Sequence, residues 1–245
     1  MHKSYYLHFL DQNMKQDTSK SIIERARLKI LKKIGRAKYG KFWIKRSNDW
    51  YSEIHDSNYL IHENFKKYLK SKSNIKKVLE IGCGTGIYPI KNKELFNKID
   101  YTGIDISESA IEYCKQNSDF NFICGDFLKM DLKEHYDLVF SHAVIDHVYE
   151  IDKFIEKAVS ISNNYVFINS YRGYFPDLEK HNMNWNRAEG CYYNDISIKQ
   201  IRKILQKIEL NENQFTIKSQ KSGQKDVNVD TQTIIEISKK KDNLH

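Results

Sequence analysis

The sequence is poor in proline and has no long apolar run. Its 245 residues contain two prolines and no serine- or glycine-rich linker, so no hinge between large domains is visible. The longest apolar stretches, such as residues 137–148, are much shorter than the about 18–20 residues that a membrane-spanning helix needs. No apolar segment of signal-peptide length follows the first residues, so we expect no secretory leader.

Cysteine is also scarce, and its spacing excludes several kinds of site. The four cysteines form no C-x-x-C pair and have no zinc-site spacing. Cys83 lies between two glycines, where a disulfide would be awkward. We therefore expect a protein of the reducing cytoplasm, with no disulfide and no metal in its site.

Positive charge is concentrated in one segment. Residues 25–46 hold ten of the 40 Lys and Arg and no acidic residue. Outside this basic arm, 30 basic residues stand against 32 acidic ones, so the rest of the protein is near neutral. The arm is compatible with a solvated helix face, with attraction to anionic lipid or RNA, or with capture of an anionic acceptor.

From residue 75 onward, short apolar runs alternate with stretches of helical periodicity. Strands are predicted at 77–81, 100–105, 120–124, 136–140, 165–169, 214–220 and 231–238. Helices are predicted at 52–69, 87–96, 108–116, 152–160 and 196–206. This order is typical of an α/β fold, with a Rossmann-like, mostly parallel seven-stranded sheet and helices on both faces. The last strand should be antiparallel, since no helix separates it from the strand before it.

Domain organisation follows from the same patterns. Residues 1–74 are predicted to form an N-terminal helical extension that includes the basic arm, 25–46. Residues 75–245 are predicted to form the main domain. Residues 170–195, which are long for a loop and rich in aromatic and polar side chains, form an insertion within it.

A glycine turn follows the first predicted strand. Glu80, Gly82, Gly84 and Gly86 stand in an E-x-G-x-G-x-G pattern just before a predicted helix. Glycines let a ligand approach the backbone, and the helix N-terminus favours an anionic group. A dinucleotide fingerprint, G-x-G-x-x-G, would need glycine at position 87, which is isoleucine, so a nicotinamide cofactor is disfavoured.

Two acidic residues follow at the ends of the next two strands. Asp105 lies 23 residues after Gly82, a spacing that suits hydrogen bonds to ribose hydroxyls. Asp126 ends the third strand, where ligands of open α/β sheets bind, and its carboxylate suits an amine such as that of adenine.

Together these segments resemble the class I S-adenosylmethionine-dependent methyltransferases, and 137–148 is similar to the fourth-strand segment of their small-molecule branch. The resemblance covers about residues 76–239. It implies S-adenosylmethionine as the cofactor. The cofactor-binding residues that we expect are Glu80, Gly82, Cys83, Gly84, Gly86, Asp105, Ile106, Asp126, Phe127, Ser141 and His142. Tyr51 is a further candidate that would close over the cofactor, although packing is its commoner use.

The residues after the fourth strand are candidates for catalysis. His147 titrates near neutral pH in water and is placed to accept a proton, while Asp146 orients it or acts itself. A structural or helix-capping role for this pair is the alternative. Some relatives bind a metal here through E-x-x-E-H, but Ala143 replaces the first carboxylate. The Asn/Asp-Pro-Pro-Tyr/Phe motif of base N-methyltransferases is also lacking.

The resemblance implies that the insertion shapes the acceptor pocket, and a packed surface lid is the alternative. Arg172 would meet an acidic group, and Tyr171 and Trp185 would stack on a ring or sugar. We therefore predict a cytoplasmic S-adenosylmethionine-dependent methyltransferase that acts on a small molecule or saccharide precursor. We expect methylation at oxygen, and an anionic acceptor is compatible with the sequence. The alternatives are an RNA methyltransferase that uses the basic arm, or a methyltransferase-like binding protein without turnover.

Overall fold

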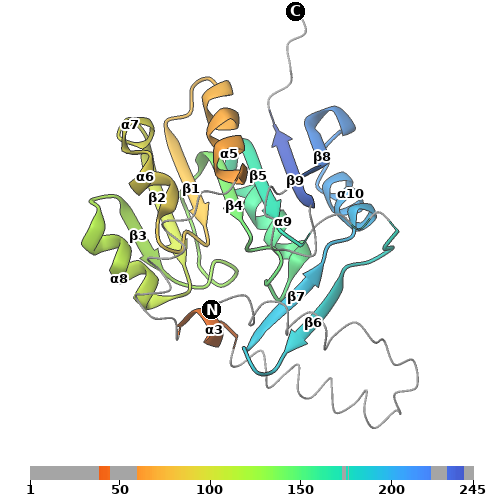
Figure 1. Ribbon diagram of the computed structural model, residues 1–245. Coiled ribbons are helices and arrows are strands. Elements are labelled where there is room, and N and C mark those ends of the chain that lie inside the picture. The colour runs from red at the N-terminus through yellow and green to blue at the C-terminus, as the bar shows by residue number, and fades with distance from the viewer. Residues whose placement is uncertain (1–38, 45–59, 173–174, 176, 222–230, 240–245) are drawn as a thin grey trace, which may run out of the picture. The chain divides into compact units, whose positions relative to one another are not determined.

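The structure of the protein is a computed structural model, which describes residues 39–44, 60–172, 175, 177–221 and 231–239 (Figure 1). The chain divides into two compact units, Met1–Lys38 and Tyr39–His245, and every described residue belongs to the second. Most of the basic arm, the predicted helical residues 52–59 and Tyr51 lie outside the described residues.

A seven-stranded sheet forms the centre of this unit, as the sequence predicted. Its strand order is β3-β2-β1-β4-β5-β9-β8. Five strands are parallel, β9 is antiparallel to both of its neighbours, and the last strand therefore reverses direction as expected. The strands are β1 (Lys77–Ile81), β2 (Asp100–Asp105), β3 (Asn121–Cys124), β4 (Tyr136–His142), β5 (Ser162–Ser170), β8 (Phe215–Lys221) and β9 (Thr231–Ser238).

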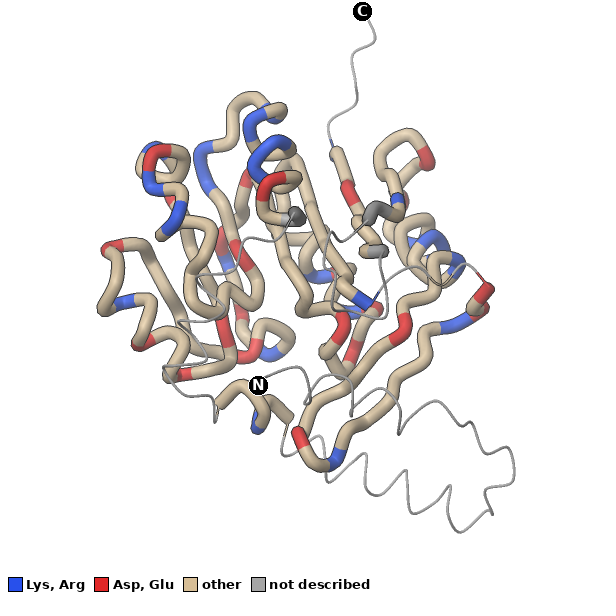
Figure 2. Tube along the Cα trace, viewed as in Figure 1, with Lys and Arg blue, Asp and Glu red and all other residues tan. Residues whose placement is uncertain are grey.

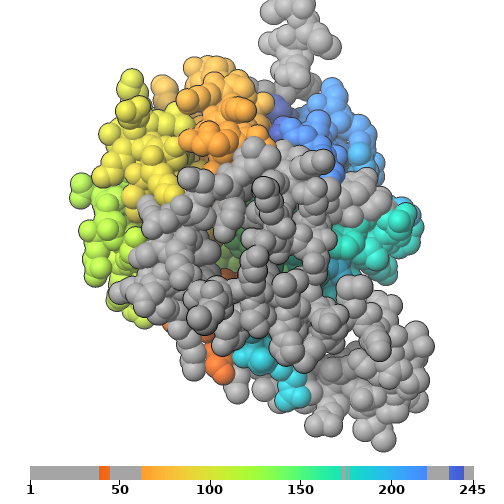
Figure 3. Space-filling view, viewed as in Figure 1, coloured from red at the N-terminus to blue at the C-terminus, as the bar shows by residue number. Residues whose placement is uncertain are grey.

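Helices cover both faces of the sheet because its strands alternate apolar residues between the faces. Val78 of β1 packs in one core cluster, whereas its neighbour Leu79 packs in the other. The first cluster includes side chains of α5 (Leu60–Ser71), α6 (Ile87–Lys91), α7 (Lys93–Phe96) and α8 (Glu108–Asn117). The second includes side chains of α9 (Ile151–Ser160) and α10 (Ile198–Lys207). Figure 3 shows α5, in orange, beside the yellow α6 and α7 on one face.

Two short elements lie beyond the carboxyl ends of the parallel strands (Figure 1). One is α3 (Lys41–Ile44), which belongs to the end of the basic arm. The other is an antiparallel hairpin of β6 (Asn182–Asn186) and β7 (Cys191–Asp195) within the insertion. The hairpin was not predicted, and residues 41–44 were predicted only as part of the N-terminal helical extension. Both elements lie where ligands of such sheets bind.

Two further details differ from the sequence-based expectations. The helix predicted at 87–96 is broken at Asn92, which ends α6 and precedes α7. A short 3-10 helix, Glu212–Gln214, precedes β8. Phe65 and Leu69 of α5 are buried in the core of the compact unit that begins at Tyr39. Among the described residues, the helices are too short or too polar to cross a bilayer.

Candidate active site

The glycine turn after β1 forms one wall of the site. Gly82 and Gly84 have positive φ angles of 72° and 51°, which side chains rarely adopt. A Cβ atom at Gly82 would lie 2.2 Å from Cγ2 of Val144, whereas one at Gly84 would meet no atom within 4 Å. Packing therefore requires glycine at 82, while the space beside Gly84 is open to a ligand.

The carboxylate of Asp105 connects this turn to the start of α8. The N–H of Gly84 donates to Oδ2 at 2.9 Å, and the N–H of Ser107 donates to Oδ1 at 2.8 Å. Burial raises the pKa of Asp105, and these backbone hydrogen bonds oppose the rise. Since a carboxylate has about four acceptor positions and three backbone groups act on this one, Asp105 keeps an acceptor position for a ribose hydroxyl.

Asp126 lies at the neighbouring strand end, in the loop after β3. Its Oδ2 accepts a hydrogen bond from the hydroxyl of Tyr149 at 2.8 Å, and its Oδ1 accepts one from the N–H of Leu128 at 3.1 Å. Lys129 pairs with the same carboxylate at 3.1 Å. The side chain is thus held at the site edge, as its predicted contact with adenine requires.

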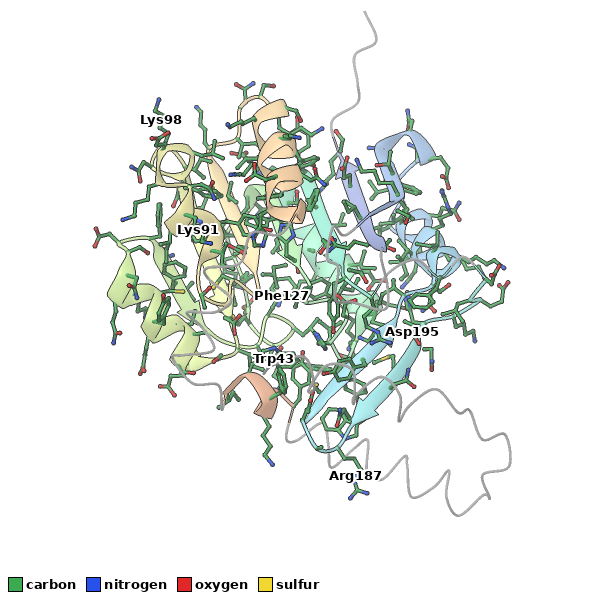
Figure 4. The ribbon with its side chains drawn as sticks, in the orientation of Figure 1. Trp43, Lys91, Lys98, Phe127, Arg187 and Asp195 are labelled. Carbon is green, nitrogen blue, oxygen red and sulfur yellow. The ribbon has the colours of Figure 1, made fainter. Side chains whose placement is uncertain are left out.

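The ring of Phe127 turns away from this edge into the core. It packs edge-on against Phe154 of α9, with ring centroids 5.5 Å apart, and only 6% of the residue is exposed. Nζ of Lys157 donates hydrogen bonds to the carbonyls of Phe127 and Met130. Lys157 therefore fixes the loop after β3. Because the ring of Phe127 is buried, only its backbone is available to contact a cofactor. Figure 4 shows Phe127 amid the central side chains.

Two polar residues end β4 and point to opposite faces of the sheet. Ser141 is fully buried, and its Oγ has no hydrogen-bond partner among the described residues. His142 stacks on Tyr88 of α6, with ring centroids 4.5 Å apart. Neither of its ring nitrogens has a partner among the described residues, and burial lowers its pKa well below the usual value.

Asp146 is completely buried, and its carboxylate accepts hydrogen bonds from the end of the neighbouring strand, β5. Its Oδ1 accepts hydrogen bonds from Oγ of Ser170 at 2.6 Å and from the N–H of Arg172 at 3.2 Å, and its Oδ2 accepts one from the N–H of Tyr171 at 3.2 Å. Burial raises its pKa to about 6, against these bonds. The hypothesis that Asp146 orients the imidazole of His147 is wrong, since its carboxylate holds the end of β5 instead.

His147 is oriented by a backbone carbonyl. Its Nδ1 lies 2.7 Å from the carbonyl oxygen of Tyr192, which can only accept, so Nδ1 carries the proton. Nε2 then has a free lone pair, which faces the hydroxyl of Tyr171 at 3.3 Å. Burial lowers the pKa of His147 to about 4, so the imidazole is neutral at pH 7.

Residues 39–44 add an aromatic wall that the sequence analysis assigned only to the basic arm. Trp43 packs edge-on against His147 at 4.9 Å, and its carbonyl accepts a hydrogen bond from Oγ of Ser107. Tyr39 packs against Tyr149 at 4.8 Å, and burial and then Asp126 raise its pKa. Only aromatic character signalled these residues, while the expected Tyr51 lies outside the described residues.

The insertion residues pair with one another. The guanidinium of Arg172 lies 2.8 Å from Oδ1 of Asp195 at the end of β7 and over the ring of Tyr193. Trp185 packs edge-on against Tyr192, its partner across the hairpin. In Figure 4, Asp195 lies at the base of the hairpin and Arg187 at its tip. Arg172, expected to meet an acidic acceptor, thus meets an acid of this chain.

The remaining predicted residues support the turn. Glu80 is buried, and its Oε2 accepts a hydrogen bond from the hydroxyl of Tyr101 at 2.5 Å. Cys83 is a buried free thiol. The side chain of Ile106 lies close to Gly40, where a Cβ atom would be 3.0 Å from Cδ1 of Ile106. Within the described ranges, no group of three or more His, Cys, Asp or Glu is arranged to hold a metal ion.

The arrangement fits S-adenosylmethionine. Open space beside Gly84 allows close approach to the glycine turn, and the carboxylates of Asp105 and Asp126 flank the next two strand ends. Buried hydroxyls of Thr85 and Ser141 lack partners among the described residues, as expected for groups that hydrogen-bond a ligand.

The fold and this site define a class I S-adenosylmethionine-dependent methyltransferase. Residues 72–214 match a family described as a methyltransferase domain, and the chain belongs to that family. S-adenosylmethionine is accordingly its cofactor.

Solved structures share the fold. The plantazolicin methyltransferase BpumL in complex with SAH has a TM-score of 0.59 and 19% identity, and the match covers 88% of this chain and 99% of that one. The magnesium protoporphyrin IX methyltransferase of Synechocystis PCC 6803 has a TM-score of 0.53 and 16% identity, covering 92% and 100%.

Curated relatives match over a shorter stretch. The malonyl-[acyl-carrier protein] O-methyltransferase of Bacillus cytotoxicus is 34% identical over 102 residues, which are 40% of this chain and 35% of that protein. The ribosomal protein L11 methyltransferase of Dictyoglomus turgidum is 29% identical over 116 residues, which are 46% and 38%. The chain therefore spans little more than a third of the length of these relatives.

Substitutions at two glycines should separate packing from ligand binding. Both positions have positive φ, so alanine adds similar backbone strain, of order 1 kcal/mol or more. Gly82→Ala adds a clash with Val144 and should lower the free energy of unfolding by at least about 1 kcal/mol more than Gly84→Ala. Gly84→Val should fold yet lose S-adenosylhomocysteine binding. Urea denaturation and calorimetry measure the two effects; wild-type affinity in folded Gly84→Val would exclude this turn as the cofactor site.

Removing the carboxylate of Asp105 should weaken cofactor binding. Asp105→Ala loses charge-assisted hydrogen bonds and also frees the N–H of Gly84, so S-adenosylhomocysteine affinity should fall by about 1–3 kcal/mol. The control is Asp131→Ala, which removes an exposed acid of the β3–β4 loop and should leave affinity unchanged. Equal affinities of the two variants would contradict the assignment.

The imidazole of His147 should stay neutral to unusually low pH. Its folded-state pKa, about 4, lies below the unfolded value near 6.5, so neutral His147 stabilises the fold above pH 6.5. That contribution should decline as pH falls from 6.5 toward 4. Titration of the His147 ring signals by NMR checks this, with exposed His135 as the control. An ordinary midpoint near 6.5 for His147 would show that the ring is solvated.

Proposed function

We propose that this protein transfers a methyl group from S-adenosylmethionine to an oxygen atom of a small-molecule acceptor. The observation that carries the proposal is the hydrogen-bonded pair of His147 and Tyr171 beside the ends of β4 and β5. The pair offers a neutral imidazole lone pair at pH 7, and an acceptor hydroxyl must lose a proton as it is methylated.

When bound, S-adenosylmethionine supplies an electrophilic methyl group on its sulfonium. The residues proposed to hold it are Asp105, Asp126 and the backbone around Gly84. The other residues of the site have to orient the acceptor and exclude water, which is the main contribution of protein to such a displacement. Trp43 and Tyr39 support that second task, because their rings pack against His147 and Tyr149 in the loop after β4.

The proton leaves the acceptor through a short path. Tyr171 donates its hydroxyl proton to Nε2 of His147 as it takes the proton of the acceptor hydroxyl. The imidazolium that results keeps its Nδ1–H on the carbonyl of Tyr192. Asp146 acts as a positioning residue, because it binds the N–H of Tyr171 and fixes the backbone that carries the phenol.

Named relatives and the aromatic hairpin support the choice of acceptor. Relatives named as malonyl-[acyl-carrier protein] O-methyltransferases support methylation at oxygen, and the aromatic hairpin with Trp185 supports a ring or a saccharide precursor. The four cysteines are free thiols, which supports a cytoplasmic location. An RNA acceptor held by the basic arm remains the second candidate, supported only by the charge of residues 25–46.

Substitution at His147 or Tyr171 should slow transfer and spare cofactor binding. His147→Phe keeps the aromatic packing against Trp43 but removes the lone pair, so kcat should fall by about 10²–10⁴-fold. Tyr171→Phe should lower kcat less, since the acceptor then reaches His147 through water. Mass spectrometry and NMR of the methylated product identify the acceptor atom. A methyl group on nitrogen or carbon, or wild-type kcat in both variants, would overturn the proposal.

A further inference from the structure

His142 lies in an aromatic cage at the carboxyl end of β4, and the proposed proton path does not use it. Its ring stacks on Tyr88 at 4.5 Å and meets Phe65 edge-on at 4.9 Å. Phe140 and Phe167 lie 5.6 Å and 5.4 Å away between ring centroids. Both ring nitrogens of His142 are buried without a partner among the described residues, as is the hydroxyl of Tyr88.

Such a residue is costly if its role is only to pack. A buried polar group without a hydrogen bond loses its interaction with water and gains nothing in return, so buried polar groups are nearly always paired. Phenylalanine would fill the same cage with no unpaired nitrogen, as Phe65, Phe140 and Phe167 already do around it. The two free nitrogens of His142 therefore indicate a group that is paired only when a ligand is bound.

The charges near His142 determine which kind of ligand group can bind there. Burial lowers the pKa of His142 well below its usual value, and the group that acts on it electrostatically is His62, whose pKa is lowered to about 4. The ring is therefore neutral at pH 7. Arg172, at the end of β5, is neutralised by Asp195. Figure 2 shows acidic residues beside the carboxyl ends of the parallel strands.

A neutral imidazole offers one N–H donor and one lone pair. A hydroxyl has both a donor and an acceptor and pairs with either nitrogen. A carboxylate only accepts, and it would bring a negative charge into an aromatic cage where no cation meets it among the described contacts of His142. The carboxylate group of S-adenosylmethionine is disfavoured there for the same reason.

We propose that His142 binds the methyl acceptor rather than the cofactor, and that it selects an acceptor with an uncharged hydroxyl at this position over one with a carboxylate. The proposal rests on the proposed function, because it names the substrate class of the same site. It differs from the expectation drawn from the family resemblance, which placed His142 among the cofactor-binding residues.

The test uses the full chain saturated with S-adenosylhomocysteine. Phenol and benzoate share one ring and differ in carrying a hydroxyl or a carboxylate, and cyclohexanol separates an alcohol from a phenol. We expect phenol or cyclohexanol to shift the ¹⁵N resonances of the His142 ring and to bind about tenfold more tightly than benzoate. Benzoate binding as tightly as both hydroxyl probes, or no shift with any probe, would overturn the proposal.

Variants identify the residue responsible. His142→Phe should weaken binding of the hydroxyl probe about tenfold or more while S-adenosylhomocysteine affinity stays within about twofold of wild type. His142→Gln keeps a donor and an acceptor and should retain part of the affinity. The matched control is His135→Phe, at an exposed histidine just before β4. Unchanged probe affinity in His142→Phe would overturn the proposal.

Two outcomes stay distinguishable. If the wild-type protein fails to bind S-adenosylhomocysteine, the proposed function fails. If it binds S-adenosylhomocysteine but His142 does not respond to the hydroxyl probes, only the assignment of His142 fails. Because the wild-type resonances decide this, the test does not depend on whether His142→Phe folds.

Discussion

The buried carboxylate of Asp146 holds the acceptor side of this protein together. It accepts hydrogen bonds from Ser170, Tyr171 and Arg172 at the end of β5, and its own carbonyl accepts one from the N–H of Asn194 in β7. Asp146, in the loop after β4, thus fixes both the end of β5 and the hairpin of β6 and β7. A buried carboxylate is costly unless its oxygens are satisfied, and three donors satisfy this one.

Asp105 performs the corresponding task on the cofactor side. Its carboxylate connects the backbone of the glycine turn to the start of α8, so one side chain joins the two segments proposed to hold the cofactor. Both acids accept hydrogen bonds from backbone N–H groups, and Asp146 also accepts one from the hydroxyl of Ser170; among the described residues, no side-chain cation pairs with either carboxylate. Such donors stabilise the charge without placing a mobile positive group in the site, and they leave lone pairs of Asp105 for a ligand.

Sequence patterns were sufficient for the sheet because its strands are local and apolar. β1, β2 and β9 begin and end where the alternation predicted. The hairpin was missed because Asn182–Asn186 has almost no strand character, and its pairing with β7 arises from the turn and from cross-strand contacts such as Trp185 with Tyr192. The break at Asn92 was missed for a related reason, since Asn is tolerated within a helix and its side-chain bond to the carbonyl of Tyr88 is visible only in three dimensions.

The residues of the candidate site also divide into those that the sequence could predict and those that it could not. The glycines and acids of the cofactor side follow strand ends at fixed spacing, so the sequence could point to them. On the acceptor side, the partners of each group come from distant segments. The carbonyl of Tyr192 orients His147 across 45 residues, and Asp195 pairs with Arg172 across 23. Proximity in sequence suggested Asp146 for the first role, and the family resemblance suggested a substrate acid for the second. Neither suggestion could anticipate how the hairpin folds back.

This division also explains how one fold serves relatives that act on different acceptors. The matched family region, residues 72–214, includes the glycine turn and both cofactor acids. Two of the segments that surround the acceptor side are α3, which lies outside that region, and the hairpin, which lies near its end. These segments contribute aromatic rings and an internally paired Arg172, so no described cation at the end of β5 is left to attract an anion. On our proposals, an acceptor is recognised by hydrogen bonds and ring contacts, to which the hairpin and α3 contribute beside His142 of the shared sheet.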